Sequence, residues 1–367
     1  MRRISKHPLS ILTTAALLGL ASHAASAAPS YTVTDLGTTG GPVSAATSLN
    51  EAGVIAGYSY TSTGQSHAVV WRNGGVRDLG TLGGSYSSVA GINEAGVMAG
   101  YAYASGDSAS HAVLWRNGSI VDLGTLGGTF SSANAINDYN QVVGASNLPG
   151  DATAHAAYWA NGRKFDLGTL GGSYSTAQAI NNLGWAVGYS YLRGDGASHA
   201  ALWNGRGAID LGTLGGANSN AQGINDAGLI AGTSELKGGL LSRATLWRNG
   251  VPSNLGALQS DHTSGAYGIN SAGQVVGYSL APFTGAGRAT LWANGCIYDL
   301  NGMVDLSGRD LTLVQASAIN DRGQIVGFGL TSSRETRAVL LTPISTSTQA
   351  YGGTRRTTPP PCTRPAM

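Results

Sequence analysis

The chain contains 367 residues, of which 42% are hydrophobic and only 11% charged, and its formal net charge is +2. Nothing in this balance predicts binding to nucleic acid or to anionic membranes, both of which require a concentrated basic surface. Two cysteines, Cys296 and Cys362, are too few for the disulfide framework of small secreted proteins, and the sequence leaves open whether they pair or stay free.

Residues 1–27 have the pattern of a secretory signal peptide. Three basic residues among the first six precede an uncharged apolar run from Leu9 to about Ala21, and cleavage is expected before Ala28. The run is shorter than the about 20 apolar residues that span a bilayer, so we expect no membrane insertion after cleavage. Removing these three cations leaves 18 of the 21 basic residues against 19 acidic ones. We expect this nearly neutral mature chain to be secreted, in an extracellular or periplasmic location.

One repeat dominates residues 28–344, which we predict to be a single repeat domain. The phrase Asp-Leu-Gly-Thr-Leu-Gly-Gly begins at Asp78, Asp122, Asp166 and Asp210, each time 44 residues further on. A tryptophan column accompanies it, at Trp71, Trp115, Trp159, Trp203, Trp247 and Trp292. An asparagine column does the same, at Asn50, Asn93, Asn137, Asn181, Asn225, Asn270 and Asn320. We count seven units, with the last two spaced less strictly, as is typical of stacked repeat proteins.

Turn residues divide each unit into four short segments. In the second unit these segments are Ser88–Ile92, Val97–Tyr103, His111–Trp115 and Ile120–Leu123. Asn93-Glu-Ala-Gly96 joins the first two, and Asn117-Gly118, a strong hairpin signal, joins the last two. Four strands in about 44 residues predict one blade of a β-propeller.

The two ends of the repeat domain complement each other. The domain begins with an isolated fourth strand, Tyr31–Gly37, and the seventh unit ends at Arg337–Leu341 without one. We therefore predict an all-β, seven-bladed β-propeller closed by the N-terminal strand, which completes the last blade and leaves no free edge. Residues 345–367, rich in Pro, Thr and Arg, are predicted to be a disordered tail because they contain too few apolar residues to fold.

The repeat resembles the HAF family of extracellular repeat proteins, named after a His-Ala-Phe step. Here that step reads His67-Ala-Val, His111-Ala-Val, His155-Ala-Ala and His199-Ala-Ala. The Asn-x-x-Gly-x-x-x-Gly step and the Asp-Leu-Gly-Thr-Leu-Gly-Gly phrase are also similar, and the resemblance covers nearly the whole mature chain. It implies an extracellular repeat protein but no particular activity. Some members carry a Pro-Glu-Pro and hydrophobic sorting signal, from which this C-terminal tail departs.

Histidines at a constant spacing are the first candidates for chemistry. An Asp follows each of them by eleven residues, in the pairs His67 and Asp78, His111 and Asp122, His155 and Asp166, and His199 and Asp210. The hairpin register makes each pair diagonal neighbours on one face. In later units the pairs become Arg243 and Asn254, Arg288 and Asp299, and Arg337 and Asp35. We interpret the column as structural hydrogen bonds and predict neither a metal site nor a cofactor, because equivalent histidines in different blades lie too far apart for one ion.

Other repeated residues also have structural interpretations. One tryptophan per unit is expected to lie in the core between blades. Asp107, Asp151 and Asp195 are weak calcium signals that we interpret as turns. Arg193-Gly194-Asp195 matches an adhesion tripeptide, a pattern with many false positives.

Catalysis would appear as ionisable residues that break the repeat. Six do so, namely Glu235, Asp261, His262, Asp305, Asp310 and Glu335. No two of them have the spacing of a nucleophile, an acid–base pair or a metal site, so an enzyme is the minority interpretation. The alternative that it represents is a secreted hydrolase or lyase acting on polysaccharide.

Tyrosines among Ser, Thr, Asn and Gly give the main binding hypothesis. We expect tight turns on one face of the propeller and longer loops on the other, which would carry Tyr58, Tyr60, Tyr86, Tyr101, Tyr103, Tyr174, Tyr189 and Tyr191. This mixture suits a binding or adhesion module for a carbohydrate or surface polymer. Two alternatives remain open: the tyrosines pack the loops together, or the protein is a structural surface protein without a small ligand.

Overall fold

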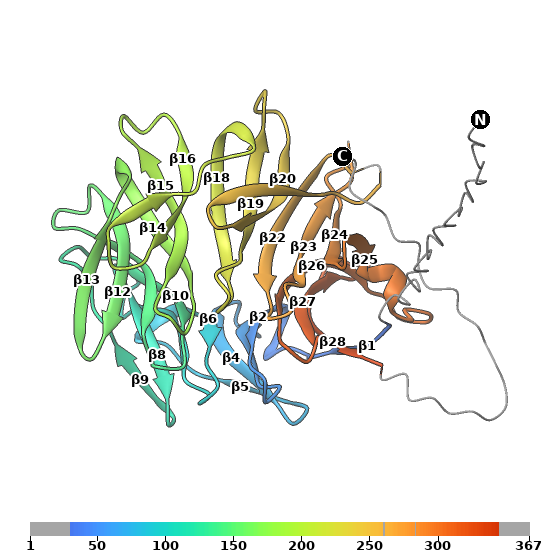
Figure 1. Ribbon diagram of the computed structural model, residues 1–367. Helices are drawn as coiled ribbons and strands as arrows, with labels where there is room; N and C mark the ends of the chain where they lie inside the picture. The colour runs from blue at the N-terminus through green and yellow to red at the C-terminus, as the bar shows by residue number, and fades with distance from the viewer. Residues whose placement is uncertain (1–29, 260, 283, 345–367) are drawn as a thin grey trace, which may run out of the picture.

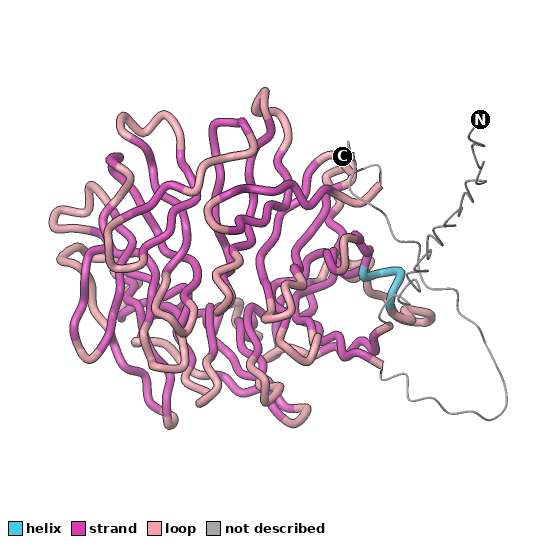
Figure 2. Tube along the Cα trace, viewed as in Figure 1, coloured by secondary structure: helices cyan, strands magenta, loops and turns pink. Residues whose placement is uncertain are grey.

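The computed structural model describes residues 30–259, 261–282 and 284–344 and is all-β, which confirms the predicted fold class at that level (Figure 1). Strands joined by loops make up nearly everything that Figure 2 draws in colour, and the one helical segment is a short 3₁₀ turn, η1 (Leu300–Met303). The predicted signal peptide and tail lie outside the described residues. Cys296 is disulfide-bonded, while Cys362, the other cysteine of the sequence, lies outside them too.

Consecutive strands pair antiparallel in groups of four, which we call units and number along the chain. The first unit contains β2 (Gly40–Leu49), β3 (Ile55–Thr61), β4 (Ser66–Arg72) and β5 (Gly75–Asp78). The second contains β6 (Gly83–Ile92), β7 (Met98–Ala104), β8 (Ser110–Arg116) and β9 (Ser119–Asp122). The third contains β10 (Ser131–Ile136), β11 (Val142–Asn147), β12 (Ala154–Ala160) and β13 (Arg163–Gly168). The fourth contains β14 (Gly171–Ile180), β15 (Ala186–Leu192), β16 (Ser198–Trp203) and β17 (Ala208–Asp210).

The remaining units follow the same order. The fifth contains β18 (Gly215–Ile224), β19 (Ile230–Leu236), β20 (Ser242–Arg248) and β21 (Val251–Gly256). The sixth contains β22 (Thr263–Ile269), β23 (Val275–Leu280), β24 (Gly287–Ala293) and β25 (Cys296–Asp299). The seventh contains β26 (Thr312–Ile319), β27 (Ile325–Leu330), β28 (Thr336–Pro343) and β1 (Tyr31–Asp35).

The pairing of β1 with β28 joins the beginning of the described chain to its end. The two strands are antiparallel, with Tyr31 opposite Pro343 and Asp35 opposite Val339 (Figure 1). Tyr31 and Val33 are buried in a cluster with residues of the sixth and seventh units, among them Leu291. The first strand therefore supplies the fourth strand that the last unit lacks, as the sequence predicts.

The asparagine column connects the units through side-chain hydrogen bonds. Each Asn Nδ2 donates to the backbone oxygen of the Asn in the next unit at 3.0–3.2 Å, and Asn320 donates back to Asn50. All seven are at most 7% exposed. The Asn50 Oδ1 also accepts from the Val54 backbone N–H within its own turn, at 3.0 Å. The residue type is thus required twice, once for the local turn and once for the contact with the next unit.

The repeated phrase carries the chain from the outer strand of one unit to the inner strand of the next. In the first unit, Asp78 Oδ1 accepts from Gly80 N–H at 2.7 Å, and Thr81 Oγ1 donates to the Gly84 carbonyl at 2.8 Å. A Cβ at Gly84 would lie 2.5 Å from the Ala104 backbone oxygen, so only glycine fits there. The phrase recurs because each crossing needs the same turn and the same close approach.

The core lies between neighbouring units. Trp115 packs with Met98 and Val113 of its own unit and with Val70 of the first, and all six tryptophans of the column are at most 4% exposed. In the second strand of each unit the backbone comes too close for a side chain, since a Cβ at Gly100 would lie 1.9 Å from the Ser88 carbonyl oxygen. This contact explains the second glycine of the Asn-x-x-Gly-x-x-x-Gly step.

Candidate functional site

The two edges of the units differ as the sequence predicts. Tight turns of the Asn-x-x-Gly and Asn-Gly types lie at one edge, which we call the turn edge. The repeated phrase and the connections between second and third strands lie at the other, which we call the loop edge.

The turn edge carries a cluster of polar and acidic groups. A cavity of about 330 Å³ opens beside the asparagine column and is lined by five carboxylates, those of Glu51, Glu94, Asp138, Asp226 and Asp321. Several of these carboxylates accept a backbone N–H from the preceding unit, for example Glu94 from Glu51 at 2.9 Å. The acidic residues therefore serve the contacts between turns.

The eight candidate tyrosines lie on strands, so the hypothesis that placed them on loops was wrong, although the predicted segment Val97–Tyr103 had assigned Tyr101 and Tyr103 to a strand. They occupy the loop-edge halves of β3, β6, β7, β14 and β15. Tyrosine favours strands, and β6 begins at Gly83, before the predicted start at Ser88, so that it includes Tyr86. Because side chains alternate along a strand, Tyr189 and Tyr191 share one face of β15.

Most of these tyrosines contact one another. The rings of Tyr86 and Tyr103 lie 5.7 Å apart, and those of Tyr101 and Tyr103 lie 6.2 Å apart. In the fourth unit, Tyr174 lies 5.8 Å from Tyr189 and 5.6 Å from Tyr191. Burial is the main cause that raises the pKa of the Tyr58, Tyr101 and Tyr189 hydroxyls above the ordinary value.

A groove opens where the fifth unit abandons this tyrosine pattern. The positions of Tyr174, Tyr189 and Tyr191 are taken 44 residues later by Asn218, Thr233 and Glu235. The smaller side chains leave a groove of about 540 Å³ between the fourth and fifth units. Its lining residues are Gln178, Tyr189, Tyr191, Ser198, Asn218, Ser219, Asn220, Gln222, Thr233, Ser234, Glu235 and Ser242. We call it the amide groove.

One side of the amide groove is fixed by a hydrogen-bonded network. The Glu235 carboxylate accepts from Asn218 Nδ2 at 3.0 Å and from the backbone N–H groups of Ala217 and Asn218 at 3.2 and 3.1 Å. Asn218 Oδ1 in turn accepts from the Ser198 backbone N–H at 3.0 Å. These bonds hold the carboxylate in one orientation before any ligand arrives.

The opposite side offers carboxamides without partners. Within the described residues, the side chains of Gln178, Asn220 and Gln222 make no hydrogen bond, and Asn220 Oδ1 is buried without a partner. Each free carboxamide has two donor hydrogens and an acceptor oxygen. Together with two tyrosine rings and one carboxylate, they can bind a ligand with many hydroxyl groups and an apolar ring face.

Of the six repeat-breaking residues, the groove contains only Glu235. Asp261 is 7% exposed and forms an ion pair with Arg288 at 2.7 Å, and Asp310 accepts from the Ser332 backbone N–H at 2.8 Å. Glu335 pairs with Arg337. Glycoside hydrolysis ordinarily needs two carboxylates about 5–10 Å apart, whereas the described lining of the amide groove includes one.

The His–Asp contacts form in all four units where they are expected. The Nδ1–carboxylate distances are 2.6, 2.7, 2.9 and 2.9 Å along the chain. The later analogues agree only in part, because Arg288 contacts Asp299 at 3.4 Å but Arg243 and Arg337 have other partners. The arginine side chain is longer than the histidine side chain, so its guanidinium group can reach partners beyond the diagonal neighbour.

The three Gly-Asp steps form turns. Asp107, Asp151 and Asp195 have positive φ angles of 57°, 59° and 57°. Each carboxylate accepts a backbone N–H at 2.7–2.8 Å from the residue 22 positions earlier, namely Ser85, Thr129 and Ser173. These hydrogen bonds lower the pKa of Asp151 and Asp195. No group of three or more potential ligands suited to a metal ion occurs among the described residues.

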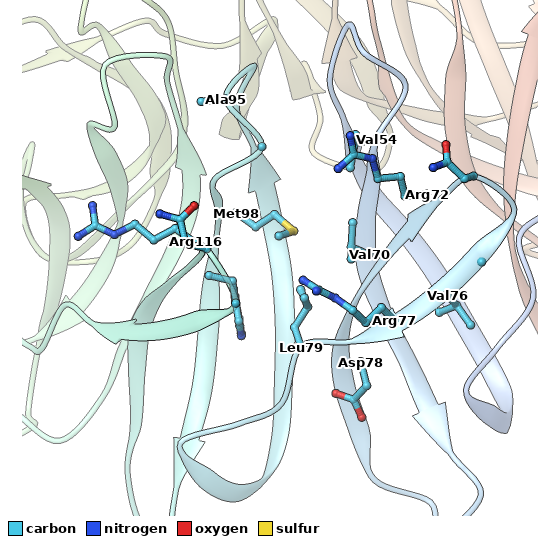
Figure 3. Close-up of a pocket in the computed structure, with 16 residues that line it drawn as sticks. Val54, Val70, Arg72, Val76, Arg77, Asp78, Leu79, Ala95, Met98 and Arg116 are labelled. Atoms are coloured by element: carbon cyan, nitrogen blue, oxygen red, sulfur yellow. The ribbon is translucent and has the colours of Figure 1, made fainter.

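A second and larger groove, which sequence reasoning missed, lies between the first and second units (Figure 3). It measures about 840 Å³, and its lining includes Arg72, Arg77 and Arg116 around an apolar floor. Arg72 and Arg77 lie in one hairpin and Arg116 in the next unit, and the chain as a whole is nearly neutral, so composition gave no sign of them. Arg72 and Arg116 occupy equivalent positions 44 residues apart, and this was the available signal.

No protein-family model and no curated protein matches the chain. Among solved structures, it is similar to TolB from Acinetobacter baumannii, with a TM-score of 0.44 and 11% identity over 80% of this chain. The chain spans 64% of that TolB chain. It is also similar to a gluconolactonase from Xanthomonas campestris, with a TM-score of 0.35 and 12% identity. That match covers 87% of this chain and 97% of the gluconolactonase chain. A triple mutant of AofleA from Arthrobotrys oligospora is similar with a TM-score of 0.39 and 11% identity. That match covers 87% of this chain and 90% of the AofleA chain. Likeness at this level assigns no function. No helix in the described residues is long and apolar enough to cross a membrane.

Proposed function

We propose that the chain is a secreted, seven-bladed β-propeller closed by its N-terminal strand, which acts as a carbohydrate-binding module through the amide groove. Closure is supported by the pairing of β1 with β28 and by the asparagine hydrogen bonds that return from Asn320 to Asn50. The disulfide bond of Cys296 supports export, because disulfides persist in oxidising compartments. N-terminal sequencing of the exported protein tests this part: Ala28 is the expected first residue, and retention of residues 1–27 would contradict it.

The departure of the fifth unit from the tyrosine pattern carries the binding proposal. Replacing three aromatic positions by Asn218, Thr233 and Glu235 exposes one side of Tyr189 and Tyr191 to a space lined by polar groups. Sugars match such a site because their hydroxyls bond to amides and carboxylates while their C–H faces stack on aromatic rings.

Two variants and a matched control test the proposal. In a glycan screen followed by calorimetry, we expect binding of an uncharged oligosaccharide that Tyr191→Ala and Glu235→Gln each weaken about tenfold. Tyr103→Ala is the control, because Tyr103 occupies the same repeat position as Tyr191 but does not line the groove. Equal losses in all three variants, or hydrolysis of the oligosaccharide that Glu235→Gln abolishes, would reject a pure binding role for this groove.

A further inference from the structure

Two neighbouring grooves on the outer side of the early units share one arginine. The first, between the first and second units, is lined by Arg72, Arg77 and Arg116. The second, between the second and third units, measures about 380 Å³ and is lined by Arg116 and Arg163. We call them the arginine grooves. Figure 3 shows Arg72 and Arg77 extending from the first unit toward the second. Arg116, on the second unit, points away from the first unit and toward the third. Arg116 therefore links the two grooves.

These guanidinium groups are not neutralised by neighbouring carboxylates. All four are exposed, and no ion pair or hydrogen bond of their side chains occurs within the described part of the chain. The one carboxylate of the first groove, Asp78, already bonds to His67 at 2.6 Å and to the Gly80 N–H at 2.7 Å. Asp122 is engaged in the same way in the second groove. The arginines keep their donors free for a ligand.

The floors of the grooves are apolar and repeat from one unit to the next. Trp115 lies in the first floor and Trp159 in the second, each 3% exposed with its indole N–H lacking a partner among the described residues. The indole N–H groups of Trp71, Trp203 and Trp292 also lack a partner among the described residues, whereas the Trp247 N–H donates to the Leu211 carbonyl at 2.9 Å. Tyr139, 69% exposed, adds an open ring face to the second groove.

We propose that the arginine grooves bind a linear acidic polysaccharide, whose carboxylate or sulfate groups pair with Arg72 and Arg77 in one groove and with Arg116 and Arg163 in the next. A guanidinium fork matches the two oxygens of a carboxylate or sulfate, and the apolar floors fit the C–H faces of sugar rings. Grooves repeated in consecutive units match a ligand whose charges also repeat. The surface is separate from the amide groove, so the proposal goes beyond an uncharged sugar ligand.

Nucleic acid is a poorer fit to the same cations. Duplex binding generally relies on many phosphate contacts, about 6–10 for a typical site, and on a strongly basic domain. The mature chain is nearly neutral, and four guanidiniums over two grooves match the sparser charge of a uronic acid polymer. A duplex is therefore an outcome to be excluded by measurement.

The test measures binding of the full mature protein to immobilised polygalacturonate, dextran sulfate, uncharged dextran and duplex DNA. We expect binding to polygalacturonate, to dextran sulfate or to both, weakened by added salt, and none to dextran. Arg77→Glu and Arg116→Glu should each weaken this binding about tenfold or more. Arg248→Glu is the matched control, because Arg248 occupies the repeat position of Arg72 and Arg116, is exposed, and lies outside both grooves. It changes the net charge equally and should alter binding less than about twofold.

Several results would overturn the proposal. These are absence of binding to both acidic polymers, tighter binding to duplex DNA, or an equal loss in Arg248→Glu, which would indicate unspecific attraction. Glu235→Gln separates this proposal from the carbohydrate site: it should leave binding to the acidic polymer unchanged. If Glu235→Gln abolishes that binding while Arg77→Glu preserves it, the polymer occupies the amide groove and the arginine grooves have no such role.

Discussion

Single carboxylates hold the loop edge of each unit together. In the first unit Asp78 accepts from its own turn and from His67, and in the second unit Asp107 accepts from the backbone N–H of Ser85. The constant spacing of His and Asp in the sequence thus reflects local geometry repeated in successive units. Because Asp122 is 44% exposed and His111 27% exposed, their pair stabilises the fold by only about 0.2–1 kcal/mol, less than a buried hydrogen bond would.

Asp195 gives a pH-dependent prediction at this scale. The backbone N–H and the hydroxyl of Ser173 lower the pKa of its carboxyl in the folded state below the ordinary value of 3.8. A lowered folded pKa means that the carboxylate stabilises the fold above pH 3.8 and that this contribution is lost as pH falls through the folded pKa. Asp195→Asn keeps the shape and tolerates the φ of 57°. We expect the melting temperature of the variant to lie below that of the parent at neutral pH, with the gap narrowing below about pH 4. A gap that does not change with pH would show that the charge plays no part.

At the scale of the elements, the sequence predicts the strands well and their ends less well. Turn chemistry is local, so Asn93 and Gly96 or Asn117 and Gly118 suffice to place the connections between strands. The loop-edge ends of the strands depend on pairing with neighbours, which is why Tyr86 fell outside the predicted segment Ser88–Ile92 although it lies in β6 and pairs with Ser66.

The grooves were harder to predict than the elements because they arise between units. Glu235 was visible as a break in the repeat, yet the groove that it lines also needs Tyr189 and Tyr191 of the fourth unit. The arginine grooves depend on the packing of one unit against the next. A single unit's sequence contains neither kind of information.

For the whole molecule, the central question is what joins the first unit to the last. The hydrogen bond from Asn320 to Asn50 and the ion pair of Arg322 with Glu51 at 3.6 Å connect their turns. A parallel bridge between Val43 and Thr336 connects their strands. The sequence predicts the β1 pairing from the missing strand alone, whereas the asparagine contacts need the three-dimensional arrangement.

Deleting residues 31–36 from the mature chain tests this connection. The deletion removes β1, unpairs one edge of β28 and exposes the surface that Tyr31 and Val33 cover, including Leu291 and Leu341. Burying an apolar side chain of this size contributes about 1.5–3 kcal/mol, so we expect the free energy of unfolding in denaturant to fall by several kcal/mol. The free strand edge should also cause association on size-exclusion chromatography, because unpaired backbone groups recruit further strands.

Two single substitutions in β1 separate packing from the mere loss of chain. Tyr31→Ala should lower stability by about 3 kcal/mol, because the ring is 3% exposed and its removal leaves a cavity. Thr32→Ala, at an exposed position of the same strand, should change stability by less than about 0.5 kcal/mol. If the deletion variant is monomeric and as stable as the parent, β1 does not close the ring, and the contacts between the seventh and first units must hold it without this strand.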